Sequence, residues 1–285
     1  MKKIPIIIFA YNRPSHFKRV MIALQNYKIK NKIYLFLDGP KNEKDKINQI
    51  DILGSITRKG KFNKFYKNQI NVFMNKHNLG LAKSITKGLD RISKIHESFI
   101  VLEDDVIPYV NMIPFFTNCI KKYQKVSNIA AICGYQFLNF EKNPKRIETK
   151  FLKHFIPWGW ATWSKNWKDY RKVNNFKDIR SCKENIPRFI TNTKKLLNKN
   201  SNKNYWSLNF MFYNYLKNNY FIFPNSSLVK NIGFDGSGTN SVVTNDLYVL
   251  ERNIKKIKFN NFNLNKSELK KQDKLLKKVI KNFYN

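Results

Sequence analysis

Apolar runs alternate with amphipathic stretches through the first 135 residues of the chain. Apolar residues from Phe17 to Leu24 recur with helical spacing, which predicts a helix that begins near Pro14. Two further helices are predicted, over residues 45–57 and after Gly80. The segments predicted as strands are residues 4–10, 32–37, 70–74, 99–102 and 129–133. This alternation is typical of an α/β domain with a Rossmann-like, mostly parallel sheet and helices on both faces.

From about residue 136 the chain becomes rich in aromatic residues, as in "PWGWATWSKNW" and "NYWSLNFMFYNYL". The pattern predicts a division into residues 1–135, residues 136–245 as a second half of the same domain, and residues 246–285 as a basic C-terminal extension. Apolar residues of "SELKKQDKLLKKVIKNFYN" fall on one side of a predicted helix and lysines on the other. Such a helix either docks on the core or lies on a membrane surface.

Polar clusters follow each of the first four predicted strands: "YNRP", "DGP", "HNLG" and "EDD". In open α/β sheets, ligands bind at the carboxyl ends of the strands. The adjacent acids Glu103, Asp104 and Asp105 repel one another unless a positive charge lies among them, and Mg²⁺ or Mn²⁺ is the usual answer. Because side chains alternate along an extended segment, we expect Glu103 and Asp105 to point one way and Asp104 the other. The alternative is a solvated turn in which the acids bind nothing.

The chain carries 54 Lys and Arg against 19 Asp and Glu, a formal charge of +35. Because Lys recurs throughout, only part of this excess favours a phosphorylated ligand or an acidic surface. Three widely spaced cysteines, Cys119, Cys133 and Cys182, indicate neither a disulfide framework nor a zinc site. No apolar run reaches the ~20 residues of a membrane span, and the residues after the apolar start do not fit a signal-peptide cleavage site. We expect a cytoplasmic protein with peripheral contact to the anionic inner face of the cytoplasmic membrane.

Six segments, taken in order, resemble glycosyltransferases of the A fold: "IIIFAYNRP", "FLDGP", "NLGLAKSITKGL", "IVLEDDVIP", "PWGWATWSKNW" and "LVKNIGFDGSGTN". The resemblance covers residues 3–245 and is strongest to bacterial sugar transferases and to the N-acetylglucosaminyltransferase I family. It implies that residues 1–135 bind a nucleotide sugar and residues 136–245 an acceptor. The implied reaction is the inverting, metal-dependent transfer of a hexosyl or N-acetylhexosaminyl group. The donor would be a UDP-sugar such as UDP-N-acetylglucosamine, and the acceptor a hydroxyl of a cell-surface or lipid-linked glycan, such as lipopolysaccharide or capsule.

The same resemblance implies roles for individual residues: Arg13 for the diphosphate, Asp38 for the uracil, Ser84 for the nucleotide, Glu103 and Asp104 for ribose or sugar hydroxyls, and Asp105 for a Mn²⁺ or Mg²⁺ ion. Three of them have simpler alternatives, because Arg13 could form a surface ion pair, Asp38 a turn and Ser84 an ordinary helix position. Trp158 and Trp160 could form the wall that faces the sugar or could pack in the core.

An inverting transferase needs a general base, normally a carboxylate. Related enzymes place an aspartate just after a tryptophan that precedes a long helix, where this chain has Ser207, Leu208 and Asn209. We therefore expect Asp235, in the glycine-rich "GFDGSGTN" loop, to be the base. The alternative is that Asp235 only shapes a turn.

Two other functions are compatible with parts of the sequence. A nucleotidyltransferase could use the same acids, but it would need a glycine-rich loop after the first strand, and "YNRPS" has no glycine. A non-enzymatic protein that binds nucleic acid or anionic lipid would explain the charge. It would leave the three acids unexplained, since acids weaken binding of a polyanion. We therefore expect no nucleic-acid partner.

Overall fold

The computed structural model describes residues 3–57, 59–62, 69–136, 145–173, 206–236 and 256–262. Its strands are β1 (Ile6–Ala10), β2 (Ile33–Leu37), β3 (Ile70–Met74), β4 (Ser98–Glu103), β5 (Val106–Pro108), β6 (Ile129–Cys133), β7 (Ile147–Leu152), β8 (Trp160–Trp163), β9 (Tyr220–Pro224), β10 (Val229–Asn231) and β11 (Ile257–Lys258). Its helices are α1 (Pro14–Asn26), α2 (Glu43–Ile56), α4 (Leu81–Ile92), α5 (Met112–Tyr123), α6 (Ser164–Arg171) and α9 (Trp206–Leu216). Strands and helices together confirm the predicted α/β class.

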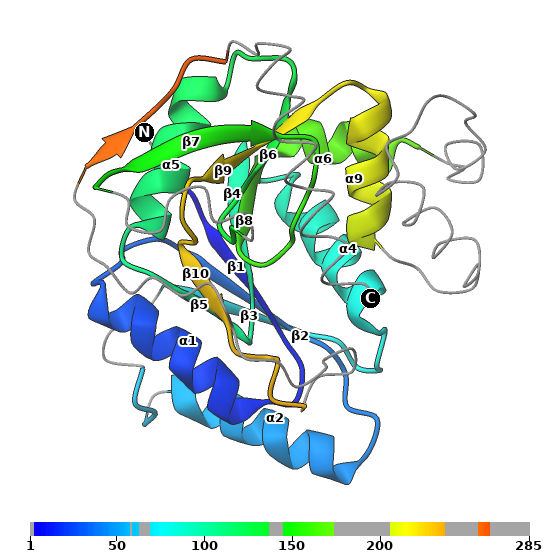
Figure 1. The fold of residues 1–285 in the computed structure, drawn as a ribbon. Coiled ribbons are helices and arrows are strands. Elements are labelled where there is room, and N and C mark those ends of the chain that lie inside the picture. The colour runs from blue at the N-terminus through cyan, green and yellow to red at the C-terminus, as the bar shows by residue number, and fades with distance from the viewer. Residues whose placement is uncertain are drawn as a thin grey trace.

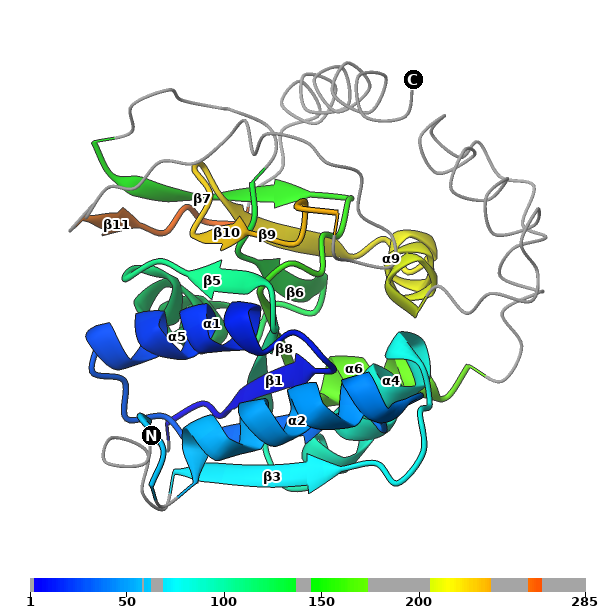
Figure 2. The ribbon, with the colours of Figure 1, turned by 90° about the horizontal axis from the view of Figure 1, so that it is seen from below.

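Nine of the strands form one mixed sheet in the order β11-β7-β9-β6-β8-β4-β1-β2-β3. The four strands from β4 to β3 are all parallel, and Ile8 of β1 lies in register between Leu35 and Leu102. Helices α1, α2 and α5 cover one face, and α4, α6 and α9 cover the other (Figures 1 and 2). Because parallel strands share a direction, the ends of β1 and β4 lie next to each other at one edge of the sheet.

Strand β8 was not predicted, and it changes the middle of the sheet. It runs antiparallel between β4 and β6, with Ala161 paired to both Ile100 and Ile132. Part of the aromatic-rich segment thus lies within the sheet itself. Strands from all three predicted segments of the chain join the same sheet, since β11 pairs with β7. The predicted helix at residues 267–285 lies outside the described residues.

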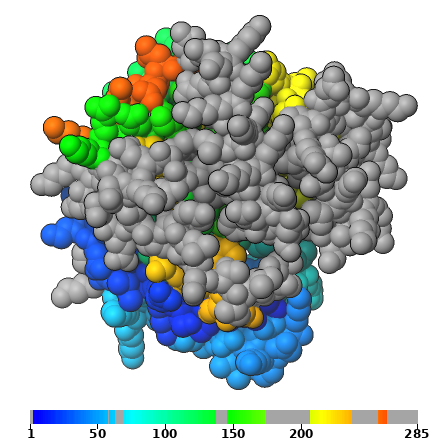
Figure 3. Space-filling model, viewed as in Figure 1, coloured from blue at the N-terminus to red at the C-terminus, as the bar shows by residue number. Residues whose placement is uncertain are grey.

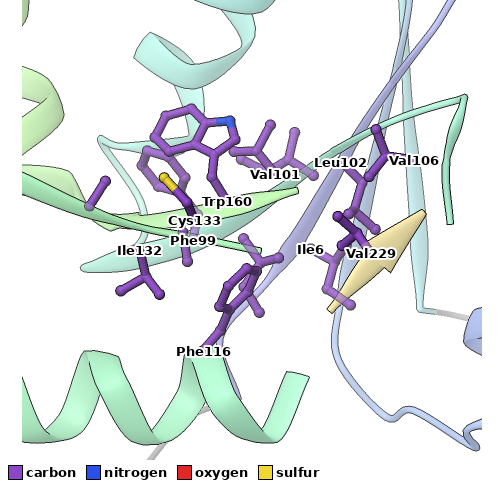
Figure 4. Close-up of a cluster of buried hydrophobic side chains, with 14 of the residues drawn as sticks. Ile6, Phe99, Val101, Leu102, Val106, Phe116, Ile132, Cys133, Trp160 and Val229 are labelled. Carbon is purple, nitrogen blue, oxygen red and sulfur yellow. The ribbon is translucent and has the colours of Figure 1, made fainter. Parts of the chain in front are cut away.

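The core lies between the sheet and its helices. Phe116 of α5 points at the strands, where Trp160, Phe99 and Ile132 are fully buried (Figure 4). At the other side of the same cluster, Val229 packs beside the end of β4 (Figure 4). Each buried aliphatic or aromatic side chain of this kind contributes about 1.5–3 kcal/mol to folding. None of the helices described is long and apolar enough to cross a bilayer.

Candidate functional site

The predicted acids meet Arg13 where β1 and β4 end. The guanidinium Nη2 of Arg13 lies 2.5 Å from Oδ1 of Asp104 and 2.8 Å from Oδ2 of Asp105. The Tyr11 amide donates to Oδ2 of Asp104 at 3.2 Å. Strand β4 ends at Glu103 and the chain turns at the next two residues, so both aspartates face Arg13. The expectation that Asp104 points away from Asp105 was therefore wrong.

Burial and crowding set the electrostatics of this cluster. Asp104 is 3% exposed, and burial raises its pKa to about 6 although Arg13 lowers it. Burial, followed by repulsion from Asp105 and Asp104, raises the pKa of Glu103 to about 8. Burial opposes the charge of Arg13, but the two aspartates outweigh it and the pKa of Arg13 is raised. The chain thus supplies its own cation to the acids, and Glu103 is largely protonated at neutral pH.

A short antiparallel ribbon brings the glycine-rich segment to the acids. Strands β5 and β10 pair with Val106 opposite Asn231, and the Ile232 amide donates to the Asp105 carbonyl at 2.8 Å. A Cβ on Gly233 would lie 2.3 Å from Oδ2 of Asp105, so only glycine fits there without moving the carboxylate. In Figure 3 the gold atoms of this segment border the blue atoms of the first helices. The described part of the sixth segment of the resemblance therefore lies beside the fourth.

The predicted base Asp235 reaches a residue that the sequence did not indicate. Oδ2 of Asp235 lies 3.0 Å from Nε2 of His16, on the first turn of α1. The Asp235 side chain is 48% exposed, whereas that of His16 is 10% exposed. Arg13 begins the same helix. The structure thus brings Arg13, the acids and Asp235 together, and adds His16.

The two candidate tryptophans have different environments. Trp160 is fully buried against Phe155, Trp206 and Phe210, so its expectation as a sugar-facing wall is not supported and the packing alternative holds. Gly159, between the two rings, has a positive φ of 64°, a backbone conformation that glycine adopts without strain. Trp158 is partly buried and its ring stands edge-on to Phe234, next to Asp235. Its role as a wall stays a prediction.

The carboxylate of Asp38 holds two loops together. Oδ1 accepts hydrogen bonds from the amides of Gly39 and Leu79 and from Asn75 Nδ2, each at 3.0 Å, and Oδ2 accepts from the Gly80 amide at 2.9 Å. These four bonds use most of the acceptor capacity of a carboxylate. The structure thus favours the turn-forming alternative for Asp38, and its contact with uracil stays a prediction.

Ser84 and the segment that lacks the expected base are both on helices. Ser84 is buried on α4, where its amide donates to the Gly80 carbonyl, and its proximity to a nucleotide stays a prediction. Ser207, Leu208 and Asn209 lie on α9, and Asn209 is buried. None of these side chains is a carboxylate, so the departure from the family pattern remains.

Asp45, which was not among the predicted site residues, also supports the site. Its carboxylate accepts a short hydrogen bond from the Tyr11 hydroxyl and another from Asn12 Nδ2 at 2.6 Å. The Asp45 amide donates to Oδ1 of Asn42, the N-cap of α2. The spacing of Asn42 and Asp45 is a capping signal that could have been noticed. This network fixes the loop that carries Arg13.

The protein could supply only some of the ligands that a divalent cation needs. The described residues contain no cluster of three or more His, Cys, Asp or Glu side chains placed to hold a metal. Mg²⁺ is commonly bound by one or two carboxylates and completed by ligand phosphates and water. Asp105, whose side chain is 14% exposed, fits such a role.

No protein-family model and no curated protein matches the chain. Solved structures that it resembles include the galactosyltransferase LgtC in complex with donor and acceptor sugar analogues, at 8% identity and a TM-score of 0.40, covering 74% of this chain and 70% of that one. A glucose-1-phosphate thymidylyltransferase from Bacillus anthracis in complex with a sucrose shares 13% identity at a TM-score of 0.35, covering 61% and 77%. The glycosyltransferase GlyE from Streptococcus pneumoniae TIGR4 shares 12% identity at a TM-score of 0.36, covering 78% and 45%. Values this low carry no information about activity.

Proposed function

We propose that this chain is a glycosyltransferase that moves a sugar from a nucleotide-diphosphate donor to a hydroxyl group. The observation that carries the proposal is the meeting of Arg13, Asp104 and Asp105 at the ends of β1 and β4, under the loop that follows β10. That edge of a parallel sheet is where α/β proteins bind nucleotides. The ordered set of six motifs supports the same reaction.

Each residue of the cluster has a defined task in this proposal. Arg13 would bind the diphosphate, for which its planar guanidinium is suited. Asp104 orients Arg13 and would thereby place the phosphates above β4. Glu103, protonated at neutral pH because its pKa is raised to about 8, would donate a hydrogen bond to a sugar or ribose oxygen. The chain thus presents both donors and acceptors to a neutral sugar beside a charged diphosphate.

Asp105 would hold a Mn²⁺ or Mg²⁺ ion that arrives with the donor. When bound, such an ion stabilises the negative charge that develops on the leaving diphosphate. Gly233 leaves room for the Asp105 carboxylate in this role. Asp235, nearly half exposed on the neighbouring loop, would accept the proton of the acceptor hydroxyl in an inverting reaction.

The finer features of the reaction are part of the proposal. The donor would be a UDP-sugar of the N-acetylglucosamine type, and the acceptor a growing cell-surface glycan, such as lipopolysaccharide or capsule. The formal charge of +35 would favour peripheral contact with anionic lipid at the cytoplasmic face of the membrane, where lipid-linked acceptors lie.

A thermal-shift screen tests the proposal directly. UDP-, GDP-, CDP- and dTDP-sugars are added with Mn²⁺ or with EDTA, because a ligand that binds only the native state raises the melting temperature. We expect a UDP-sugar to raise it, and Asp105→Ala to reduce this rise and UDP release by at least tenfold. The matched control is Asp51→Ala, which removes an exposed acid that pairs with Lys18.

Three results would overturn the proposal. The first is a screen in which no nucleotide sugar binds or reacts. The second is release of pyrophosphate from a nucleoside triphosphate and a sugar phosphate, which would indicate a nucleotidyltransferase. The third is micromolar, steeply salt-dependent binding of RNA or anionic vesicles without sugar-nucleotide binding, which would indicate a basic binding protein.

A further inference from the structure

His16 occupies an unusual position for a buried polar residue. Its side chain is 10% exposed and lies on the first turn of α1, three residues after Arg13. Nδ1 of its ring is 3.3 Å from the Ser15 hydroxyl. Nε2 is 3.0 Å from Asp235 Oδ2 but is not aligned for a hydrogen bond, and it has no hydrogen-bond partner in the described part of the chain. A buried ring nitrogen in this state costs free energy unless a partner completes it.

The partner available to His16 is the loop that carries the proposed base. That loop is fixed at two other points: the Ile232 amide donates to the Asp105 carbonyl, and Phe234 packs edge-on against Trp158. Asp235 follows directly, with about half of its side chain exposed. One carboxylate oxygen therefore faces a buried imidazole at the same edge of the sheet as the acid cluster.

We propose that His16 is a positioning residue for Asp235, an inference that rests on the proposed function. In this arrangement the Ser15 hydroxyl would donate to Nδ1, the ring would carry its proton on Nε2, and a side-chain rotation would align this N–H with Oδ2 of Asp235. The other oxygen of Asp235 is then held toward the acceptor. In the transfer step the acceptor O–H gives its proton to Asp235, and the acceptor oxygen bonds to the anomeric carbon of the donor. The bond from that carbon to the diphosphate breaks, and its electron pair leaves with the diphosphate.

This arrangement supplies what the chain lacks at Ser207, Leu208 and Asn209. A base on an exposed loop has many orientations, and misplacement by about 1 Å can cost a factor of about 100 in rate. Anchoring one oxygen against a buried ring on a helix restricts those orientations. His16 thus joins the rigid part of the fold to a loop that would otherwise hold its base loosely.

Kinetics of single and double variants test the inference. UDP release from UDP-N-acetylglucosamine, with water as acceptor, is measured for His16→Phe, His16→Gln, Asp235→Asn and the double variant His16→Phe/Asp235→Asn. We expect His16→Phe to lower kcat by about 10- to 100-fold with little change in the KM for the donor. His16→Gln, which keeps an N–H donor, should recover most of the loss. The double variant should be no slower than Asp235→Asn, because His16 acts only through Asp235. Lys18→Met, on an exposed part of α1, is the matched control.

An effect of His16→Phe that persists unchanged in the Asp235→Asn background would overturn the inference, as would equal losses in donor binding and kcat. Failure of the proposed function looks different, because the wild type itself would then neither bind nor cleave the sugar nucleotide. A measurement without turnover covers that case. The ¹⁵N shifts of His16, assigned by their loss in His16→Gln, should show the proton on Nε2 and should move in Asp235→Asn. A proton on Nδ1 of His16, or ¹⁵N shifts of His16 that stay unchanged in Asp235→Asn, would contradict the pairing of His16 with Asp235.

Discussion

Replacing Arg13 with methionine should make the stability of the protein depend strongly on pH. Asp104 is 3% exposed and its pKa is about 6 even with Arg13 beside it, against an ordinary value of 3.8. A difference of about two units means that the ionised carboxylate already costs the folded state about 3 kcal/mol above pH 6. The guanidinium keeps this cost from rising further, because its charge lowers the pKa of both Asp104 and Glu103.

The sign follows from proton binding. A carboxyl whose pKa is raised in the folded state binds protons more tightly there than in the unfolded chain, so its stability contribution is lost as pH rises. In the wild type, the stability contributed by Asp104 is lost between about pH 4 and pH 6. In Arg13→Met the loss continues to higher pH, because the pKa of Asp104 rises further without the guanidinium. Removing one partner of a buried pair costs about 3–5 kcal/mol when the other stays charged. We therefore expect a loss of about 3–5 kcal/mol at pH 8 and of less than about 2 kcal/mol at pH 5, where Asp104 is protonated in both proteins.

Urea unfolding, followed by tryptophan fluorescence at pH 5 and pH 8 and constant ionic strength, measures this difference. The control is Lys18→Met, which breaks an ion pair of 2.7 Å with Asp51 between exposed side chains and should cost about 0–1 kcal/mol at both pH values. The reasoning is refuted if the loss in Arg13→Met is the same at both pH values, or if it stays under about 1 kcal/mol at pH 8.

Five further substitutions separate packing from binding. Gly233→Ala should push Asp105 aside, destabilise the protein by about 1–3 kcal/mol and weaken UDP-sugar binding measured by calorimetry. The control Gly54→Ala lies on an open helix face and should instead stabilise the protein by up to about 1 kcal/mol. Trp160→Ala should lower the free energy of unfolding in urea by about 3–5 kcal/mol. Trp158→Ala should lower it less but reduce UDP release more. A larger loss of UDP release in Trp160→Ala than in Trp158→Ala would assign the sugar wall to Trp160. Asp38→Asn should lower the free energy of unfolding by about 1.5–3 kcal/mol through its lost charge-assisted bonds, and an unchanged stability with weaker uridine binding would favour the nucleotide role.

Strands β1, β2, β3, β4 and β6 could be predicted from the sequence because each is a separate apolar run. β3 and β6 begin and end where the apolar runs do, and α1 begins at the predicted proline. Strand β8 carried no such signal, because "WATW" follows a glycine in a run of aromatics, and the strands that pair with it on both edges are distant in the chain. Fully buried strands lose the alternation that identifies half-buried ones. The sugar-facing alternative for Trp160 came instead from the family resemblance, which does not distinguish a ligand-facing ring from a packed one.

The site shows a second kind of limit. The prediction that a positive charge lies among the three adjacent acids was right. The spacing of the residues could not show whether that charge is a metal ion or a side chain. Arg13 is 91 residues from Asp104, and the two meet because β1 and β4 are neighbours that point the same way. Polar segments after both strands had been placed at one edge of the sheet, so adjacency of those two strands was the missing step. The pairing of β5 with β10 that brings Asp235 to His16 had no comparable signal in the sequence.

Because one guanidinium serves both Asp104 and Asp105, a diphosphate that binds Arg13 must compete with these carboxylates. Protonation of Glu103 and Asp104 shifts that competition toward the phosphate. Charge is thus shared within the site before any ligand arrives.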